Sequence, residues 1–111
     1  MRVLVTRPLE DGTETARQLA ARGHEALLAP LLMTCFFGGP DIALDGVQAI
    51  LVTSANGIRA LARRSQRRDL PVFAVGPQTA AEAKKLGFAT VRNASGDAEA
   101  LARATRGWAK P

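Results

Sequence analysis

The feature that most constrains this chain is the stretch 48–61, where a short apolar run passes directly into polar side chains and then into helical spacing. The run, residues 49–52, is too short for a helix and rich in β-branched side chains. This predicts a strand that is buried on both faces. The polar side chains that follow at once are Thr53, Ser54 and Asn56. They suit the N-cap of a helix.

Such a strand-to-helix junction favours anions. Hydroxyl groups, free backbone N–H groups and the positive end of a helix dipole meet at the carboxyl end of a strand. In open α/β sheets, anionic ligands bind at this position. Ser54 alone is explained by helix capping, so the hypothesis of a ligand site depends on further junctions of the same kind.

The rest of the chain alternates between strand and helix patterns. The expected strands are residues 2–6, 25–29, 49–52, 70–75 and 88–91. Strands that alternate with helices over short loops pair in parallel through right-handed crossovers. We therefore expect an α/β fold, a parallel sheet with flanking helices. If all the strands share one sheet, a flavodoxin-like order is the simplest arrangement.

One flexible joint interrupts this alternation. Gly38, Gly39 and Pro40 form it, and the apolar segment 31–37 before it is either an edge strand or a crossing segment. We expect residues 1–111 to form a single α/β unit.

Helix ends carry local signals. Asp11 with Glu14 three residues later forms a capping-box pattern, and Ser95 or Asp97 is expected to cap the last helix. Pro77 stands where a first helical residue is expected.

Composition excludes several classes of protein. The 111 residues are 47% hydrophobic and 23% charged, which is typical of a globular domain. No apolar run approaches the ~20 residues of a membrane span. The single cysteine, Cys35, suits the reducing cytoplasm and is expected to be a small buried hydrophobic residue.

The charge is unevenly distributed. Residues 1–55 hold four basic and six acidic side chains, net −2, whereas residues 56–111 hold eleven and four, net +7. A basic half favours a polyanionic partner, either nucleic acid or a small molecule with several carboxylates or phosphates. A solvated arginine-rich surface explains the same charge.

Three strand-to-helix junctions remain as candidate chemistry, at 6–8, 53–57 and 76–79. In one parallel sheet all of them would lie at the same edge and display a cation, several hydroxyls and unpaired N–H groups. Such a surface binds carboxylates or phosphates. With one histidine and one cysteine, far apart in sequence, and no glycine-rich nucleotide motif, we expect no metal-dependent chemistry.

Several short fragments of the chain follow one another in a characteristic order. They are VLVTRP at 3–8, GHE at 23–25, PLL at 30–32, AILVTSANG at 49–57, PVFAVG at 71–76 with Thr79 and Ala80, and Gly96 with Asp97. Their order and spacing together resemble the N-terminal half of the uroporphyrinogen-III synthase family.

The resemblance implies a cofactor-free enzyme of tetrapyrrole biosynthesis. Members of the family close linear hydroxymethylbilane to uroporphyrinogen III, with loss of water and inversion of ring D. They bind this polycarboxylate in a cleft between two flavodoxin-like domains and hold it in the productive conformation. The resemblance also implies a crossover between domains at 32–40 of this chain. The substrate-binding residues expected here are Arg7, Thr53, Ser54, Asn56, Gly76 and Thr79.

The chain also departs from the family pattern. It lacks the strands that complete the first domain, and it contains no tyrosine, the residue type that the resemblance links to loss of water. It is either a fragment or a short relative, whose first β-α-β segment folds back onto the later strands. A homodimer that exchanges residues 1–37 is a further interpretation. The alternatives to a synthase are a non-catalytic tetrapyrrole- or anion-binding remnant and, third, a nucleic-acid-binding module.

Overall fold

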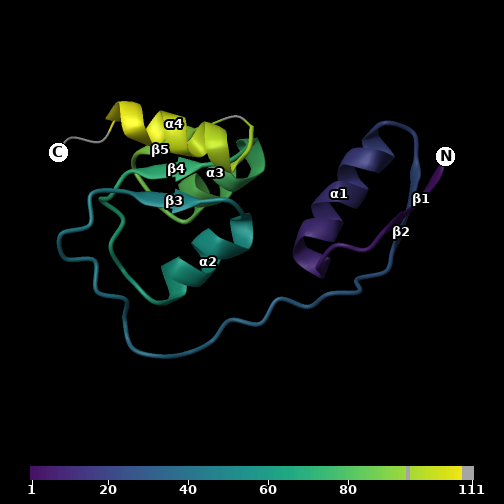
Figure 1. Ribbon diagram of the computed structural model, residues 1–111. Helices are drawn as coiled ribbons and strands as arrows, with labels where there is room; N and C mark the ends of the chain where they lie inside the picture. The colour runs from purple at the N-terminus through teal and green to yellow at the C-terminus, as the bar shows by residue number, and fades with distance from the viewer. Residues whose placement is uncertain (95, 109–111) are drawn as a thin grey trace. The chain divides into compact units, whose positions relative to one another are not determined.

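The computed structural model describes residues 1–94 and 96–108 and divides the chain into two compact units, Met1–Phe36 and Phe37–Pro111 (Figure 1). We call these the first unit and the second unit. The boundary falls inside the segment 32–40, but a crossover between domains there stays a prediction, as does a single unit over 1–111. None of the helices in the described ranges is long and apolar enough to span a membrane.

The first unit is a β-α-β arrangement with a thin core. It contains β1 (Arg2–Val5), α1 (Leu9–Ala21) and β2 (Glu25–Leu28), and the two strands pair in parallel. On one face of the sheet, Gly12 brings the α1 backbone close to Val5 and Leu28. On the other face, Leu4 and Leu27 are exposed. Among the described residues of this unit, Val5 is the one buried hydrophobic side chain.

The second unit is a three-stranded parallel sheet with helices. Its elements are β3 (Ile50–Val52), α2 (Ala55–Arg63), β4 (Val72–Ala74), α3 (Pro77–Lys85), β5 (Val91–Asn93) and α4 (Ala98–Trp108). The strand order is β3-β4-β5, and each pair is parallel (Figure 1). The expected α/β fold with parallel strands and flanking helices is therefore confirmed.

Both faces of this sheet carry a hydrophobic cluster. On one face, Val72 of β4 packs with Ile58 of α2 and Ala83 of α3. On the other face, Phe73 is covered by α4, and its ring meets that of Trp108 edge to face with centroids 5.5 Å apart. Trp108 thus covers an apolar surface inside the fold.

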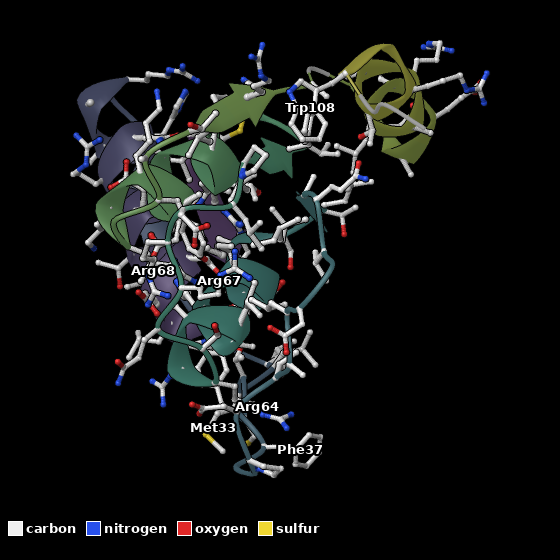
Figure 2. All side chains as sticks on the ribbon, turned by 90° about the vertical axis from the view of Figure 1, so that its left-hand side faces the viewer. Met33, Phe37, Arg64, Arg67, Arg68 and Trp108 are labelled. Atoms are coloured by element: carbon white, nitrogen blue, oxygen red, sulfur yellow. The ribbon has the colours of Figure 1, made fainter. Side chains whose placement is uncertain are left out.

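The connector between the units has neither helix nor strand from residue 29 to residue 49. The segment 31–37 is therefore not an edge strand. Phe37 is exposed and points away from the ribbon (Figure 2). Cys35 is also exposed, so the expectation that it is buried was wrong: it lies in a stretch of the connector where Met33 and Phe37 are exposed as well.

The strands do not share one sheet. β1 pairs with β2, and β3 to β5 form a separate sheet. The expectation that the junctions at 6–8, 53–57 and 76–79 lie at one sheet edge was therefore wrong for the first of them. Within each sheet the strands are joined by short crossover helices, whereas a long connector without regular structure separates β2 from β3.

Two local boundaries also differ from expectation. Asp11 does not cap α1: the helix begins at Leu9, after Pro8, and Asp11 is buried within its first turn. The last strand begins at Val91 instead of residue 88, because Phe88 N–H donates to the Ala83 carbonyl and still belongs to the turn that ends α3.

The start of α4 agrees with one of the two N-caps that we expected for the last helix. The side chain of Asp97 accepts a hydrogen bond from Ala100 N–H at 3.0 Å. Ser95, the other expected cap, lies outside the described residues.

Glu14 should make α1 sensitive to acid. Hydrogen bonds from Arg17 (2.7 Å) and Gln18 (2.9 Å) lower the pKa of its carboxyl from 4.5 to about 2. Because the folded pKa is lowered, the contribution of this contact to stability is complete above pH 4.5 and is lost as the pH falls toward 2. An NMR titration should give a midpoint of about 2, which Arg17→Met should raise toward 4.5. A wild-type midpoint near 4.5 would contradict this prediction.

Candidate functional site

The junction between β3 and α2 is built as a helix start with free donors. Ser54 is the N-cap, in an extended conformation, and its Oγ accepts a hydrogen bond from Gly57 N–H at 3.1 Å. The N–H groups of Ala55 and Asn56 in the first turn have no acceptor within the helix. Thr53 is exposed at the end of the strand. This junction therefore presents two backbone donors and a free hydroxyl.

The Asn56 side chain at this junction is hydrogen-bonded to Arg59, one helical turn further along α2. Its Oδ1 accepts a hydrogen bond from Arg59 Nη1 at 2.9 Å. Arg59 Nε in turn donates to Glu82 Oε1 of α3 at 3.0 Å, and the two charged side chains are only 12% and 13% exposed. A nearly buried ion pair therefore joins α2 to α3, and its arginine is the hydrogen-bond partner of Asn56.

The junction between β4 and α3 depends on glycine. Gly76 is the N-cap with φ +83°, a conformation that favours glycine, and it makes no side-chain cap. Pro77 follows at the first helical position. Thr79 is buried, with 6% exposure, so its hydroxyl is poorly placed to meet a ligand. This helix start therefore leaves its first N–H groups without a side-chain acceptor.

The structure brings these two junctions together. β3 and β4 are adjacent and parallel, with Val52 opposite Ala74, and Val75 N–H donates to the Val52 carbonyl at 3.1 Å. The predicted residues that lie together at this sheet edge are Thr53, Ser54, Asn56, Gly76 and Thr79.

Arg7 does not belong to this group. It lies in the first unit, after β1, and its Nη1 donates to Thr15 Oγ1 at 2.8 Å. The start of α1 also differs in charge, because Glu10 and Asp11 stand in its first turn. Neither α2 nor α3 has an acidic residue in its first turn. The positive ends of these two helix dipoles therefore remain available to an anion.

Sequence reasoning missed Arg59 and Glu82. Asn56 and Arg59 are three positions apart in a helix, so their contact could have been expected from spacing alone. Glu82 carries no such signal, because it is 23 positions from Arg59 and only the packing of α2 on α3 brings it there.

A cavity of about 360 Å³ lies on the face of the sheet that α4 covers. It is lined by Phe73, Arg92 and Trp108, among others, next to α4. No residue of the two junctions lines this cavity. In the described ranges, no three histidine, cysteine, aspartate or glutamate side chains are grouped to hold a metal ion.

Capping and ligand contact can be separated at this site. Ser54→Ala should lower the free energy of unfolding by about 1 kcal/mol, because Gly57 N–H loses its acceptor. Thr53→Ala should change it by less than about 0.5 kcal/mol, because the side chain is exposed. Urea unfolding followed by circular dichroism measures both. Equal effects of the two substitutions would argue against the assigned cap.

Comparison with known proteins identifies a family for this chain. A search of curated proteins found no match for the chain. The family described as uroporphyrinogen-III synthase HemD matches residues 13–111, a range that includes both junctions of the second unit. On this match, the chain belongs to the uroporphyrinogen-III synthase family.

Proposed function

We propose that this chain acts in tetrapyrrole biosynthesis by cyclising hydroxymethylbilane to uroporphyrinogen III. Ring D is inverted and water is lost in this reaction. The observation that carries the proposal is the family match over residues 13–111. The paired helix starts of α2 and α3 support it, because their N–H groups and hydroxyls suit the carboxylates of the substrate.

In this proposal the protein works by holding a flexible substrate. Thr53, Ser54 and Asn56 donate hydrogen bonds to one carboxylate, and the backbone at Gly76 and Thr79 meets another. Positioning of reacting groups lowers the entropic part of a barrier and needs no cofactor. Arg7, which lies in the first unit, stays a predicted substrate contact. The proposed location of the enzyme is the cytoplasm.

The test is turnover of freshly generated hydroxymethylbilane, with the type III product measured against the type I product that forms spontaneously. Type III product above the no-protein control supports the proposal. If only type I forms while the chain still binds the polycarboxylate, it is a non-catalytic binding remnant.

The nucleic-acid alternative is weakened by the contacts of the arginine run, residues 63–68. Arg64 donates to the Pro40 carbonyl at 2.9 Å, and Arg67 donates to Asp69 and to the Leu44 carbonyl. Figure 2 shows Arg64, Arg67 and Arg68 in the segment where α2 ends. These guanidinium groups are occupied within the second unit, so they are poorly suited to contact phosphates. A nucleic-acid partner would bind with an affinity that falls steeply with salt.

We also propose that the working form is a homodimer that exchanges residues 1–37. The support is the thin core of the first unit, since segments below about 40 residues rarely fold without further partners. Leu4 and Leu27 leave an apolar face that a second copy can cover. Light scattering should give twice the chain mass of 11.7 kDa, and Leu27→Glu should shift it toward the monomer. A monomer at all concentrations would contradict exchange.

A further inference from the structure

The contact between Arg59 and Asn56 determines which way the Asn56 amide points. An amide has an acceptor oxygen at one end and a donor NH2 group at the other, whereas a guanidinium can only donate. The atom of Asn56 that meets Arg59 Nη1 at 2.9 Å is therefore the oxygen. The Nδ2 group is left as the free end, and in the described part of the chain it has no hydrogen-bond partner.

Arg59 is well suited to hold this orientation and poorly suited to bind an anion itself. Its charge is balanced by Glu82, with Nε to Oε1 at 3.0 Å, and the pair is only 12% and 13% exposed. Removing Arg59 would leave the nearly buried carboxylate of Glu82 without this cation, which is strongly unfavourable. Arg59 is thus fixed between α2 and α3, and it fixes Asn56 in turn.

We propose that Arg59 and Glu82 are positioning residues that present the Asn56 amide as a hydrogen-bond donor to a substrate carboxylate. This inference rests on the proposed function. The Nδ2 donor adds to the backbone N–H groups in the first turn of α2, so a bound carboxylate there meets donors alone. Such a lining selects an ionised carboxylate over a neutral group, because only the ionised form accepts at every lone pair.

The sharpest variant is Asn56→Asp. It keeps an acceptor oxygen for Arg59, so the fold is expected to be retained, but it replaces the free donor with a second acceptor that carries charge. We expect the thermal midpoint not to fall, because a carboxylate in the first turn of α2 suits the helix dipole. We expect the KM for hydroxymethylbilane to rise about ten- to hundredfold, which is the size expected for a lost hydrogen bond to a charged group. A KM equal to that of the wild type would overturn the donor role while leaving the proposed function intact.

A second variant tests the positioning role. Arg59→Met with Glu82→Met removes both charges together and leaves neither buried alone. We expect the KM to rise several-fold, and Asn56→Ala should then have a smaller effect in this background than in the wild type. The matched control removes the exposed pair of α4, Arg103→Met with Glu99→Met, which changes the charge equally and should leave the KM unchanged. Additive effects of the two changes would overturn the positioning role.

An NMR measurement separates this inference from the proposed function. In the free wild-type chain, a scalar coupling across the hydrogen bond should link the Arg59 guanidinium nitrogen to the Asn56 side-chain carbonyl carbon. Its presence supports the orientation, and its absence overturns it, whether or not the chain turns over substrate. If the coupling is present and the wild type neither binds nor converts hydroxymethylbilane, the proposed function fails and the donor role fails with it.

Discussion

Replacement of Phe73 with alanine is expected to lower the free energy of unfolding by about 3 to 5 kcal/mol, the usual cost of removing a buried aromatic ring. Phe73 is 1% exposed, at the centre of the middle strand β4. Its ring is packed edge to face against Trp108 and contacts the cluster under α4. Truncation leaves a cavity that the surrounding side chains can fill only in part.

Leu51 provides the matched control. It lies opposite Phe73 in the register of β3 and β4 and points to the same face of the sheet, but it is 48% exposed. Leu51→Ala should lower stability by less than about 1 kcal/mol, because little apolar surface is buried there. Urea unfolding curves of both variants, followed by circular dichroism, give the comparison. Similar losses in the two variants would show that α4 does not pack on Phe73 as described.

Arg68→Met is expected to have the second largest effect. It should lower the free energy of unfolding by about 2 to 3 kcal/mol, although Arg68 belongs to the arginine run. The guanidinium donates to backbone carbonyls at the ends of both α2 and α3, and it lies 4.9 Å from the centre of the Phe88 ring. Methionine keeps the apolar stem and removes every donor. The carbonyls of Ala62 and Leu86 then lose their charged partner.

The control for Arg68 is Arg106→Met, which removes the same charge from an exposed position on α4. This change should leave the free energy of unfolding within about 0.5 kcal/mol of the wild type. Arg68→Lys should fall between the two, because an ammonium offers one compact charge instead of a planar fork of donors. If Arg68→Met and Arg106→Met were equally stable, the arginine run would be solvated surface.

Local signals predicted much of the second unit. The apolar run of β3, the Ser54 cap and the Pro77 start of α3 are each determined by neighbours in sequence, and each lies where it was expected. The predicted start of the last strand at Phe88 was wrong. An aromatic residue followed by Ala, Thr and Val is typical of a strand, which is why the strand was expected to begin there. A hydrogen bond from Phe88 N–H to the Ala83 carbonyl extends the helical turn instead.

Relations between distant segments were not predictable in the same way. Nothing in the pattern of β1 indicates that it pairs with β2 alone and not with β3, because parallel strands of similar composition are interchangeable partners. The same holds for Glu82, whose role depends on the packing of one helix against another. Strand identity is a local property, whereas sheet membership and buried ion pairs are properties of the whole fold.

The packing of Trp108 on Phe73 gives the protein a built-in spectroscopic reporter. Trp108 is the sole tryptophan and the chain has no tyrosine, so its intrinsic fluorescence originates in the second unit. The far-ultraviolet dichroism, in contrast, includes α1 of the first unit. When both signals are recorded in one denaturant series, coincident curves indicate that the units unfold together. Separate curves indicate that the thin-cored first unit opens before the fluorescence changes.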